Sequence, residues 1–215
     1  MMHANRIQVA AEVSAKAPTR RSLAKQQTRA KVLAAARRLF SEQGYEGATI
    51  RDIAAAAGMS TGAVFANFSD KSDLFRAIMV TDMTTLADAM RDAAGHGNGV
   101  EDTLLRMFAA GYGFYQTQLP LARAAFGVGW SPQDGPALRS AAPVQLLNSL
   151  MAEQLTQAAE RGELKDEDLA LRAQMLFDTY LSNYPQAIFE NWTVEALQDR
   201  SRDQIRILLA GARTS

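Results

Sequence analysis

Apolar residues recur along this chain at the three- and four-residue spacings of α-helices. The clearest stripe lies within residues 26–43, where the recurring apolar positions are Val32, Leu33, Ala36, Leu39 and Phe40. After Lys25, no stretch alternates apolar and polar residues for long enough to indicate a β-strand. The pattern therefore predicts an all-α fold of about nine helices.

Three of the predicted helices follow one another closely near the N-terminus. The helix over residues 26–43 should end at Gly44, and Thr49 should cap the second helix through its hydroxyl. The second helix should stop near Gly58, which can adopt a positive φ, and Ser60 should cap a short third helix. Because the connection is so short, the last two helices must cross steeply, which is the geometry of a helix-turn-helix.

The remainder of the chain predicts longer helices. A fourth helix should begin at Asp70 and Asp73 and run to about residue 94. Further helices are predicted over residues 101–118, 121–128, 143–161, 168–183 and 194–212. Pro143 and Pro185 interrupt apolar patterns, so each starts a helix or kinks one, and the sequence leaves both interpretations open. We divide the chain into a flexible basic arm (1–24), a helix-turn-helix domain (25–72) and a helical C-terminal domain (73–215).

Composition excludes several classes of protein. The 215 residues are 47% hydrophobic and 21% charged, which is typical of a globular protein. The absence of cysteine excludes disulfides and thiolate metal sites, and two histidines leave few imidazole ligands. The start of the chain lacks the pattern of a signal peptide, and no run approaches ~18 apolar residues. We therefore expect a cytoplasmic protein without a cofactor, a metal or a membrane span.

The net charge is zero, but the charges are distributed unevenly. Residues 1–80 hold 12 Lys/Arg and 6 Asp/Glu, and residues 81–215 hold 11 and 17, so the two parts carry +6 and −6. This asymmetry favours an N-terminal part that binds a polyanion such as nucleic acid. The alternative is a solvated tail, because basic residues near the start of the chain would also keep a flexible arm in solution.

The segment TIRDIAAAAGMSTGAVFANFSDKSDLF, residues 49–75, resembles the DNA-binding signature of the tetracycline-repressor-like (TetR) family of bacterial transcription regulators. The matching elements stand in the family's order and spacing, from Gly44 and Thr49 through Gly58, Phe68 and Lys71. The resemblance implies a repressor that binds a palindromic double-stranded DNA operator as a homodimer, with the third helix in the major groove. The sequence itself does not distinguish repression from activation.

The resemblance places DNA contacts on the second, third and fourth helices. Arg51 matches a family position that reaches a base edge, and we expect it to contact guanine; a surface salt bridge is the alternative. Lys71 matches the family's phosphate-binding lysine. Phe65 replaces a tyrosine more common in the family, so we expect an apolar contact, with simple packing as the alternative. The predicted DNA-binding residues are Thr49, Arg51, Ser60, Thr61, Gly62, Ala63, Phe65, Asn67 and Lys71.

The resemblance also implies that the C-terminal domain binds an effector and forms the dimer. The predicted dimer contacts are Leu171, Met175, Leu197, Ile205 and Leu208. The predicted ligand-binding residues are Met83, Leu86, Met90, Met107, Phe108, Tyr112, Tyr115, Phe126, Trp130 and Asn148. Large adaptable side chains of this kind suit a small, largely apolar effector, although a Met and aromatic stripe is also typical of plain core.

Two other interpretations of the sequence are a regulator without a small-molecule effector and an enzyme. A DNA-binding regulator controlled by a protein partner, or acting without an effector, is the main alternative. An enzyme is not expected, because the chain shows no nucleophile–base spacing, no metal cluster and no phosphate-binding loop.

Overall fold

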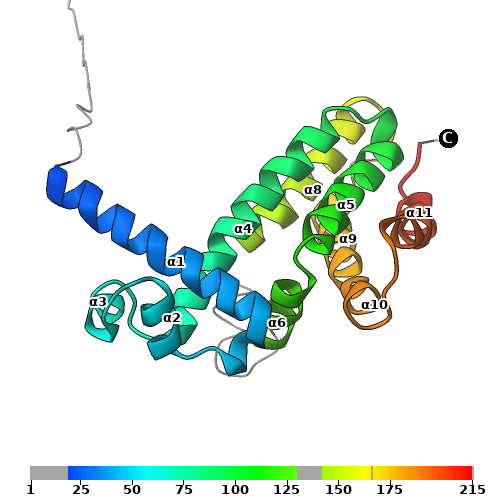
Figure 1. The fold of residues 1–215 in the computed structure, drawn as a ribbon. Coiled ribbons are helices and arrows are strands. Elements are labelled where there is room, and N and C mark those ends of the chain that lie inside the picture. The colour runs from blue at the N-terminus through cyan, green and yellow to red at the C-terminus, as the bar shows by residue number, and fades with distance from the viewer. Residues whose placement is uncertain (1–18, 130–141, 166, 215) are drawn as a thin grey trace, which may run out of the picture.

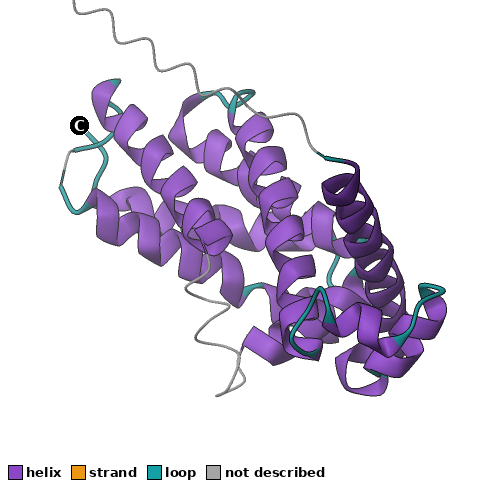
Figure 2. Ribbon diagram, turned by 90° about the vertical axis from the view of Figure 1, so that its left-hand side faces the viewer, coloured by secondary structure: helices purple, strands orange, loops and turns teal. Residues whose placement is uncertain are grey.

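The computed structural model describes residues 19–129, 142–165 and 167–214, and every regular element in these ranges is a helix (Figures 1 and 2). The all-α prediction is confirmed. The helices are α1 (Arg20–Gly47), α2 (Ile50–Ala56), α3 (Thr61–Phe65), α4 (Lys71–Ala94), α5 (Gly99–Gln116), α6 (Leu119–Gly129), α8 (Ala142–Glu160), α9 (Leu169–Ser182), α10 (Tyr184–Phe189) and α11 (Val194–Ala210).

Helix α1 begins earlier than predicted. Thr19 caps it, with the Thr19 hydroxyl accepting a hydrogen bond from the backbone N–H of Ser22 at 3.2 Å. Residues 20–24, which we assigned to the flexible arm, are therefore helical, because good helix formers follow directly on an N-cap. The rest of the arm, residues 1–18, lies outside the described residues. Near its C-terminus α1 is broken at Gly44, whose φ of 76° confirms the predicted end of the regular helix.

The caps predicted for the next helices are present. Thr49 accepts a hydrogen bond from the N–H of Asp52 at 3.2 Å, and Ser60 accepts one from the N–H of Ala63 at 3.2 Å. Asp70 caps α4 through a bond from the N–H of Asp73 at 2.7 Å. Gly58, between α2 and α3, has a φ of 68°, as the predicted turn requires. These local signals fix where α3 begins and how it leaves α2.

The buried residues form two separate hydrophobic clusters. The first, which we call the N-terminal core, joins α1, α2 and α3 to the start of α4 and to Leu121 and Val128 of α6. The second, the C-terminal core, joins the rest of α4 to α5, α8, α9, α10 and α11. Helix α4 runs through both cores, and Figure 1 shows it leaving the α1–α3 end of the molecule and continuing along the helical bundle.

One helix, α10, was not predicted, and the starts of α8 and α10 resolve the question of the two prolines. Pro185 lies in the first turn of α10, a short helix between α9 and α11, and Pro143 is the second residue of α8. Each proline therefore starts a helix rather than kinking one, as expected where the missing N–H has no helical acceptor.

Candidate nucleic-acid interface

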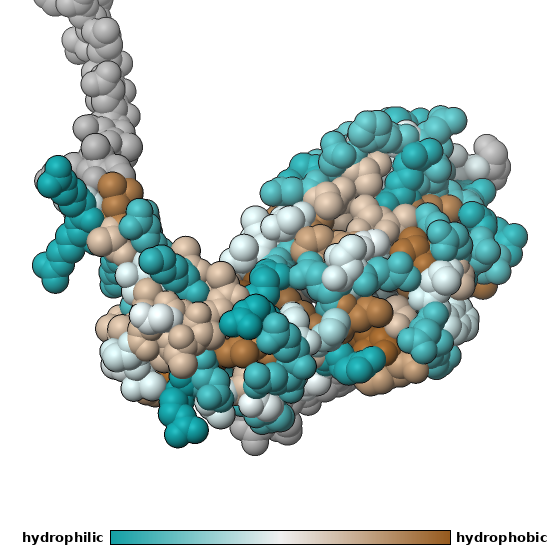
Figure 3. Space-filling model, in the orientation of Figure 1, coloured by the Kyte–Doolittle hydropathy of each residue, from teal (hydrophilic) through white to brown (hydrophobic). Residues whose placement is uncertain are grey.

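Helix α3 buries one side chain in the domain, and the opposite face of the helix is exposed. Val64 is fully buried in the N-terminal core, whereas Thr61 and Gly62 are exposed. Phe65 is 55% exposed, so a large part of its ring does not pack against the rest of the domain. An exposed aromatic ring beside small residues allows close approach to a base step in a groove. Figure 3 shows small and weakly apolar residues at this end of the molecule, bordered by hydrophilic side chains.

Arg51 and Thr49 lie on and before α2, next to α3. Arg51 is exposed, and none of the ion pairs found within the described ranges involves it. The salt-bridge alternative therefore has no support here, and the guanidinium is available to a guanine edge. The Thr49 hydroxyl donates to the Asp52 carboxylate at 2.5 Å, so Thr49 acts first as a helix cap.

Lys71 has structural partners that the sequence did not reveal. Its Nζ donates to the carbonyl oxygen of Tyr45 at 3.0 Å and lies 4.4 Å from the centroid of the Tyr45 ring. These contacts tie the start of α4 to the end of α1. Because an ammonium group carries three donors, a phosphate contact by Lys71 remains compatible with this anchor and stays a prediction.

Arg29 of α1 is a positioning residue that sequence reasoning missed. Its guanidinium donates to the carbonyl oxygen of Asn67 at 2.9 Å and lies 4.1 Å from the centroid of the Phe68 ring. Asn67 in turn donates from Nδ2 to the carbonyl oxygen of Ala63 at 2.9 Å, which places its amide along α3. The long separation in sequence between α1 and α3 gave no signal of this contact. Arg29 thereby holds the C-terminal end of α3 against α1.

Replacing Arg29 with methionine should weaken operator binding about fivefold and lower the free energy of unfolding by about 1 kcal/mol, because a charge-assisted bond and a cation–π contact are lost. Lys31→Met is the matched control, since Lys31 is exposed on the same helix and loses the same charge. Fluorescence anisotropy with a duplex and urea unfolding measure the two effects. Equal loss of affinity in both variants would mean that Arg29 acts only through its charge.

The predicted ligand-binding residues pack as core. Leu86, Met90, Met107, Phe108, Tyr112 and Tyr115 are buried in the C-terminal core, and Met83 and Phe126 pack partly buried against it. Asn148 is half-buried and donates to Gln174 at 3.3 Å. Trp130 lies outside the described residues. These side chains touch one another rather than line the groove described below, so their role toward a ligand stays a prediction.

Hydroxyl and amide groups inside the C-terminal core satisfy one another. Asn183, fully buried, donates to the hydroxyl of Tyr112 at 3.0 Å and to the side-chain oxygen of Gln204 at 2.8 Å. Tyr180 and Tyr184 bond through their hydroxyls, and the Tyr184 hydroxyl also donates to a carbonyl oxygen of α5. Burial raises the pKa of both tyrosines, so each hydroxyl remains a neutral donor.

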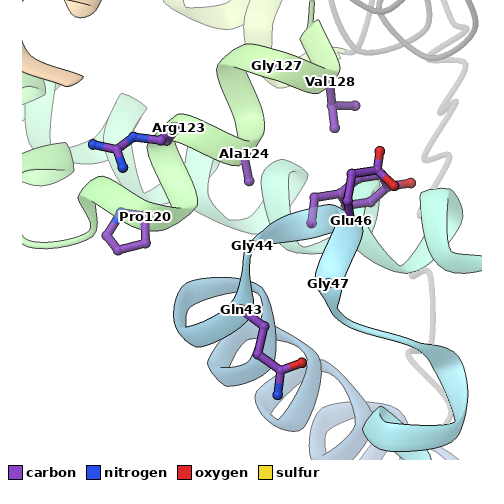
Figure 4. Close-up of a pocket in the computed structure, with 10 residues that line it drawn as sticks. Gln43, Gly44, Glu46, Gly47, Pro120, Arg123, Ala124, Gly127 and Val128 are labelled. Atoms are coloured by element: carbon purple, nitrogen blue, oxygen red, sulfur yellow. The ribbon is translucent and has the colours of Figure 1, made fainter. Parts of the chain in front are cut away.

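A groove of about 380 Å³ lies between the C-terminal end of α1 and α6 (Figure 4). Its walls include Gly44 and Gly47 on one side and Ala124 and Gly127 on the other. Arg123 points away from α1 in Figure 4, and its guanidinium donates to the carbonyl oxygen of Ile188 in α10 at 2.8 Å. The groove therefore lies at the junction with the DNA-binding end, outside the residues predicted to bind a ligand.

The predicted dimer contacts divide into two groups. Leu171 and Met175 on α9 are 60% and 43% exposed, and Leu208 is half-buried. Leu197 and Ile205 of α11 are wholly buried in the chain's own core, so their burial gives no support to the predicted dimer contact, which stays a prediction. A helix carries apolar residues on more than one face, and the sequence pattern does not say which face another helix of the same chain covers.

The described residues give no evidence of a metal site or of a membrane-spanning helix. Within 19–129, 142–165 and 167–214, no group of three His, Cys, Asp or Glu side chains is arranged to hold a metal ion. None of the helices in these ranges combines the length and the apolar character that crossing a bilayer requires.

Comparison with known proteins agrees with this geometry. Residues 32–78 match the family described as bacterial regulatory proteins, tetR family. The chain is 40% identical over 81 residues to the HTH-type transcriptional repressor AcnR of Corynebacterium diphtheriae, a match that spans 38% of this chain and 40% of that relative. The chain thus matches well under half the length of this relative. Both matches are to regulators of transcription.

Solved structures share the fold over most of the chain. A TetR-family regulator of Mesorhizobium loti superposes with a TM-score of 0.71 at 18% identity, covering 88% of this chain and 98% of that one. FadR of Bacillus subtilis, solved in complex with stearoyl-CoA, has a TM-score of 0.70 at 18% identity and covers 85% and 98%. Residues 32–78 therefore match the tetR family of bacterial regulatory proteins, and the described chain shares the fold of the solved structures named above.

Proposed function

We propose that this chain is a cytoplasmic transcriptional repressor that binds a palindromic DNA operator as a homodimer. The observation that carries the proposal is the outer face of α3, which leaves Thr61, Gly62 and Phe65 exposed while Val64 anchors the helix. Arg51 is exposed on the adjacent helix. A recognition helix this short reads few base pairs, so useful specificity requires a second half-site and a second copy of the chain.

The surface that supports a dimer lies on α9 and α11. Leu171 and Met175 of α9 are exposed, and Ile207 of α11 is 71% exposed. The two helices are held together by Arg172, whose guanidinium donates to the carbonyl oxygen of Leu208 at 2.6 Å. Exposed apolar side chains on two helices fixed side by side are typical of a surface that pairs with its own copy about a two-fold axis.

Two measurements test the proposal together. Light scattering should give the mass of two chains, and selection from a random duplex library should enrich an inverted repeat. Leu171→Arg should yield a folded monomer with much weaker operator binding, because the residue is exposed in the single chain and a charge would be buried in the pair. A monomeric parent chain, or an enriched sequence without inverted symmetry, would overturn the proposal.

Release of the operator by a small, largely apolar effector is the form of regulation that the predicted ligand-binding residues suggest. Methionine and aromatic side chains can repack around an apolar molecule, and the FadR neighbour was solved with a long-chain acyl thioester. The closed packing of those residues here favours a second candidate, a repressor governed by a protein partner or by no effector. Thermal shift with a panel that includes stearoyl-CoA separates them: an effector both raises the melting temperature and releases DNA.

A further inference from the structure

Asp82 lies on α4 at the boundary between the two cores. On its N-terminal side, Ile78 and Met79 belong to the N-terminal core, and on its other side Leu86 belongs to the C-terminal core. Asp82 is 3% exposed, and it is the only charged side chain that is buried among the described residues. A buried charge between two apolar clusters is unusual enough to require a partner.

The partner is Arg37 of α1, and it joins three elements at one point. One guanidinium nitrogen of Arg37 pairs with the Asp82 carboxylate, and the other donates to the side-chain oxygen of Gln118 at 2.6 Å. Gln118 lies in the turn between α5 and α6. Arg37 therefore connects the DNA-binding domain through α1, the continuous helix α4, and the connection to α6.

The energetics of this contact favour a geometric role over a stabilising one. Burial raises the pKa of Asp82, and the hydrogen bond and charge of Arg37 offset that effect only in part. The second carboxylate oxygen of Asp82 is buried and has no hydrogen-bond partner. A buried ion pair that is incompletely satisfied adds little to the stability of a fold. Its donors are directional, however, whereas the apolar contacts on either side are not.

We propose that the Arg37–Asp82 pair, with Gln118, fixes the angle between the DNA-binding domain and the C-terminal domain. In the dimer that our proposed function requires, this angle sets the separation of the two α3 helices. The pair thereby determines how strictly the protein selects the spacing of operator half-sites. Arg37 and Asp82 act as positioning residues and make no contact with DNA.

The test uses the double variant R37M/D82L, which replaces the pair by apolar side chains of similar length and leaves no unpaired buried charge. Because the chain has no cysteine, Ala66→Cys and Thr156→Cys place two spin labels, one beyond α3 and one on α8. Both positions are exposed. Labelled chains are diluted with unlabelled chains, and pulsed electron paramagnetic resonance gives the distance distribution within one chain. Arg38→Met is the matched control, since Arg38 pairs with Glu42 on the exposed face of the same helix.

We expect the distance distribution to broaden or shift in R37M/D82L and to stay unchanged in Arg38→Met, with the unfolding midpoint of the double variant at or above that of the parent. An unchanged distribution in the double variant, or an equal change in the control, would overturn the proposal. This readout needs neither DNA nor a dimer, so it distinguishes failure here from failure of the proposed function.

A second readout connects the angle to DNA. The parent chain should bind the selected operator more tightly than the same duplex with one base pair inserted between the half-sites. In the double variant the ratio of these two affinities should fall about tenfold. Loss of stability alone lowers both affinities together and leaves their ratio constant. A broadened distance distribution with an unchanged ratio would refute the part of the proposal that concerns half-site spacing.

Discussion

Replacing Gly111 with alanine should lower the free energy of unfolding by about 3 kcal/mol or prevent folding, because the added methyl group has no space. A Cβ atom at Gly111 would lie 2.8 Å and 2.9 Å from two carbon atoms of the Tyr180 ring. Tyr180 cannot turn aside, since it is fully buried, stacks on Tyr112 with centroids 5.2 Å apart, and bonds to Tyr184. Chemical unfolding of the purified variant measures the loss.

Gly113 provides the control for this substitution on the same helix. A Cβ atom at Gly113 meets nothing within 4 Å, so Gly113→Ala should raise the free energy of unfolding by about 1 kcal/mol through helix propensity alone. The two substitutions, two residues apart on α5, should therefore move stability in opposite directions. Similar effects from both would show that Tyr180 does not approach α5 as closely as the structure places it.

Replacing Phe65 with alanine should weaken operator binding about thirtyfold, or ~2 kcal/mol, while leaving the unfolding midpoint almost unchanged. The ring is 55% exposed in the free chain, so it contributes little to the core and is available to make apolar contact with DNA. Binding is measured by fluorescence anisotropy with the selected operator at constant salt.

Phe189→Ala is the matched control for Phe65. Phe189 is 61% exposed and lies on α10, in the C-terminal domain rather than on the recognition helix. Its removal should leave operator affinity unaltered, whereas a general effect of losing an exposed aromatic ring would appear in both variants. If Phe65→Ala bound the operator as tightly as the parent chain, the assignment of α3 as the recognition helix would lose its main support.

Local structure was predictable because its causes are local. The N-caps at Thr49 and Ser60, the start of α4 near Asp70 and the positive φ at Gly44 and Gly58 depend on residues a few positions away, and all are present. The start of α1 was misplaced because a basic sequence reads as a solvated tail even where its residues favour helix. Helix α10 was missed because a six-residue helix gives too short a pattern to recognise.

Contacts between distant segments were not predictable. Arg29 lies 38 residues from Asn67, and Arg37 lies 45 residues from Asp82, and nothing in either pattern signals that these side chains meet. The division between Leu171, which is exposed, and Leu197, which is buried, has the same origin. Both residues belong to apolar stripes, and only the packing of α11 against the rest of the chain decides which stripe is covered.

The separation of the buried residues into two cores has a consequence for how the molecule responds to stress. The N-terminal core is the smaller cluster, and its helices α2 and α3 are only 7 and 5 residues long. Short helices depend on tertiary packing, so this region opens at a lower free energy than the helical bundle. On mild heating or in dilute denaturant, the protein would therefore lose the ability to read DNA while its bundle is still assembled, and that loss would reverse on cooling.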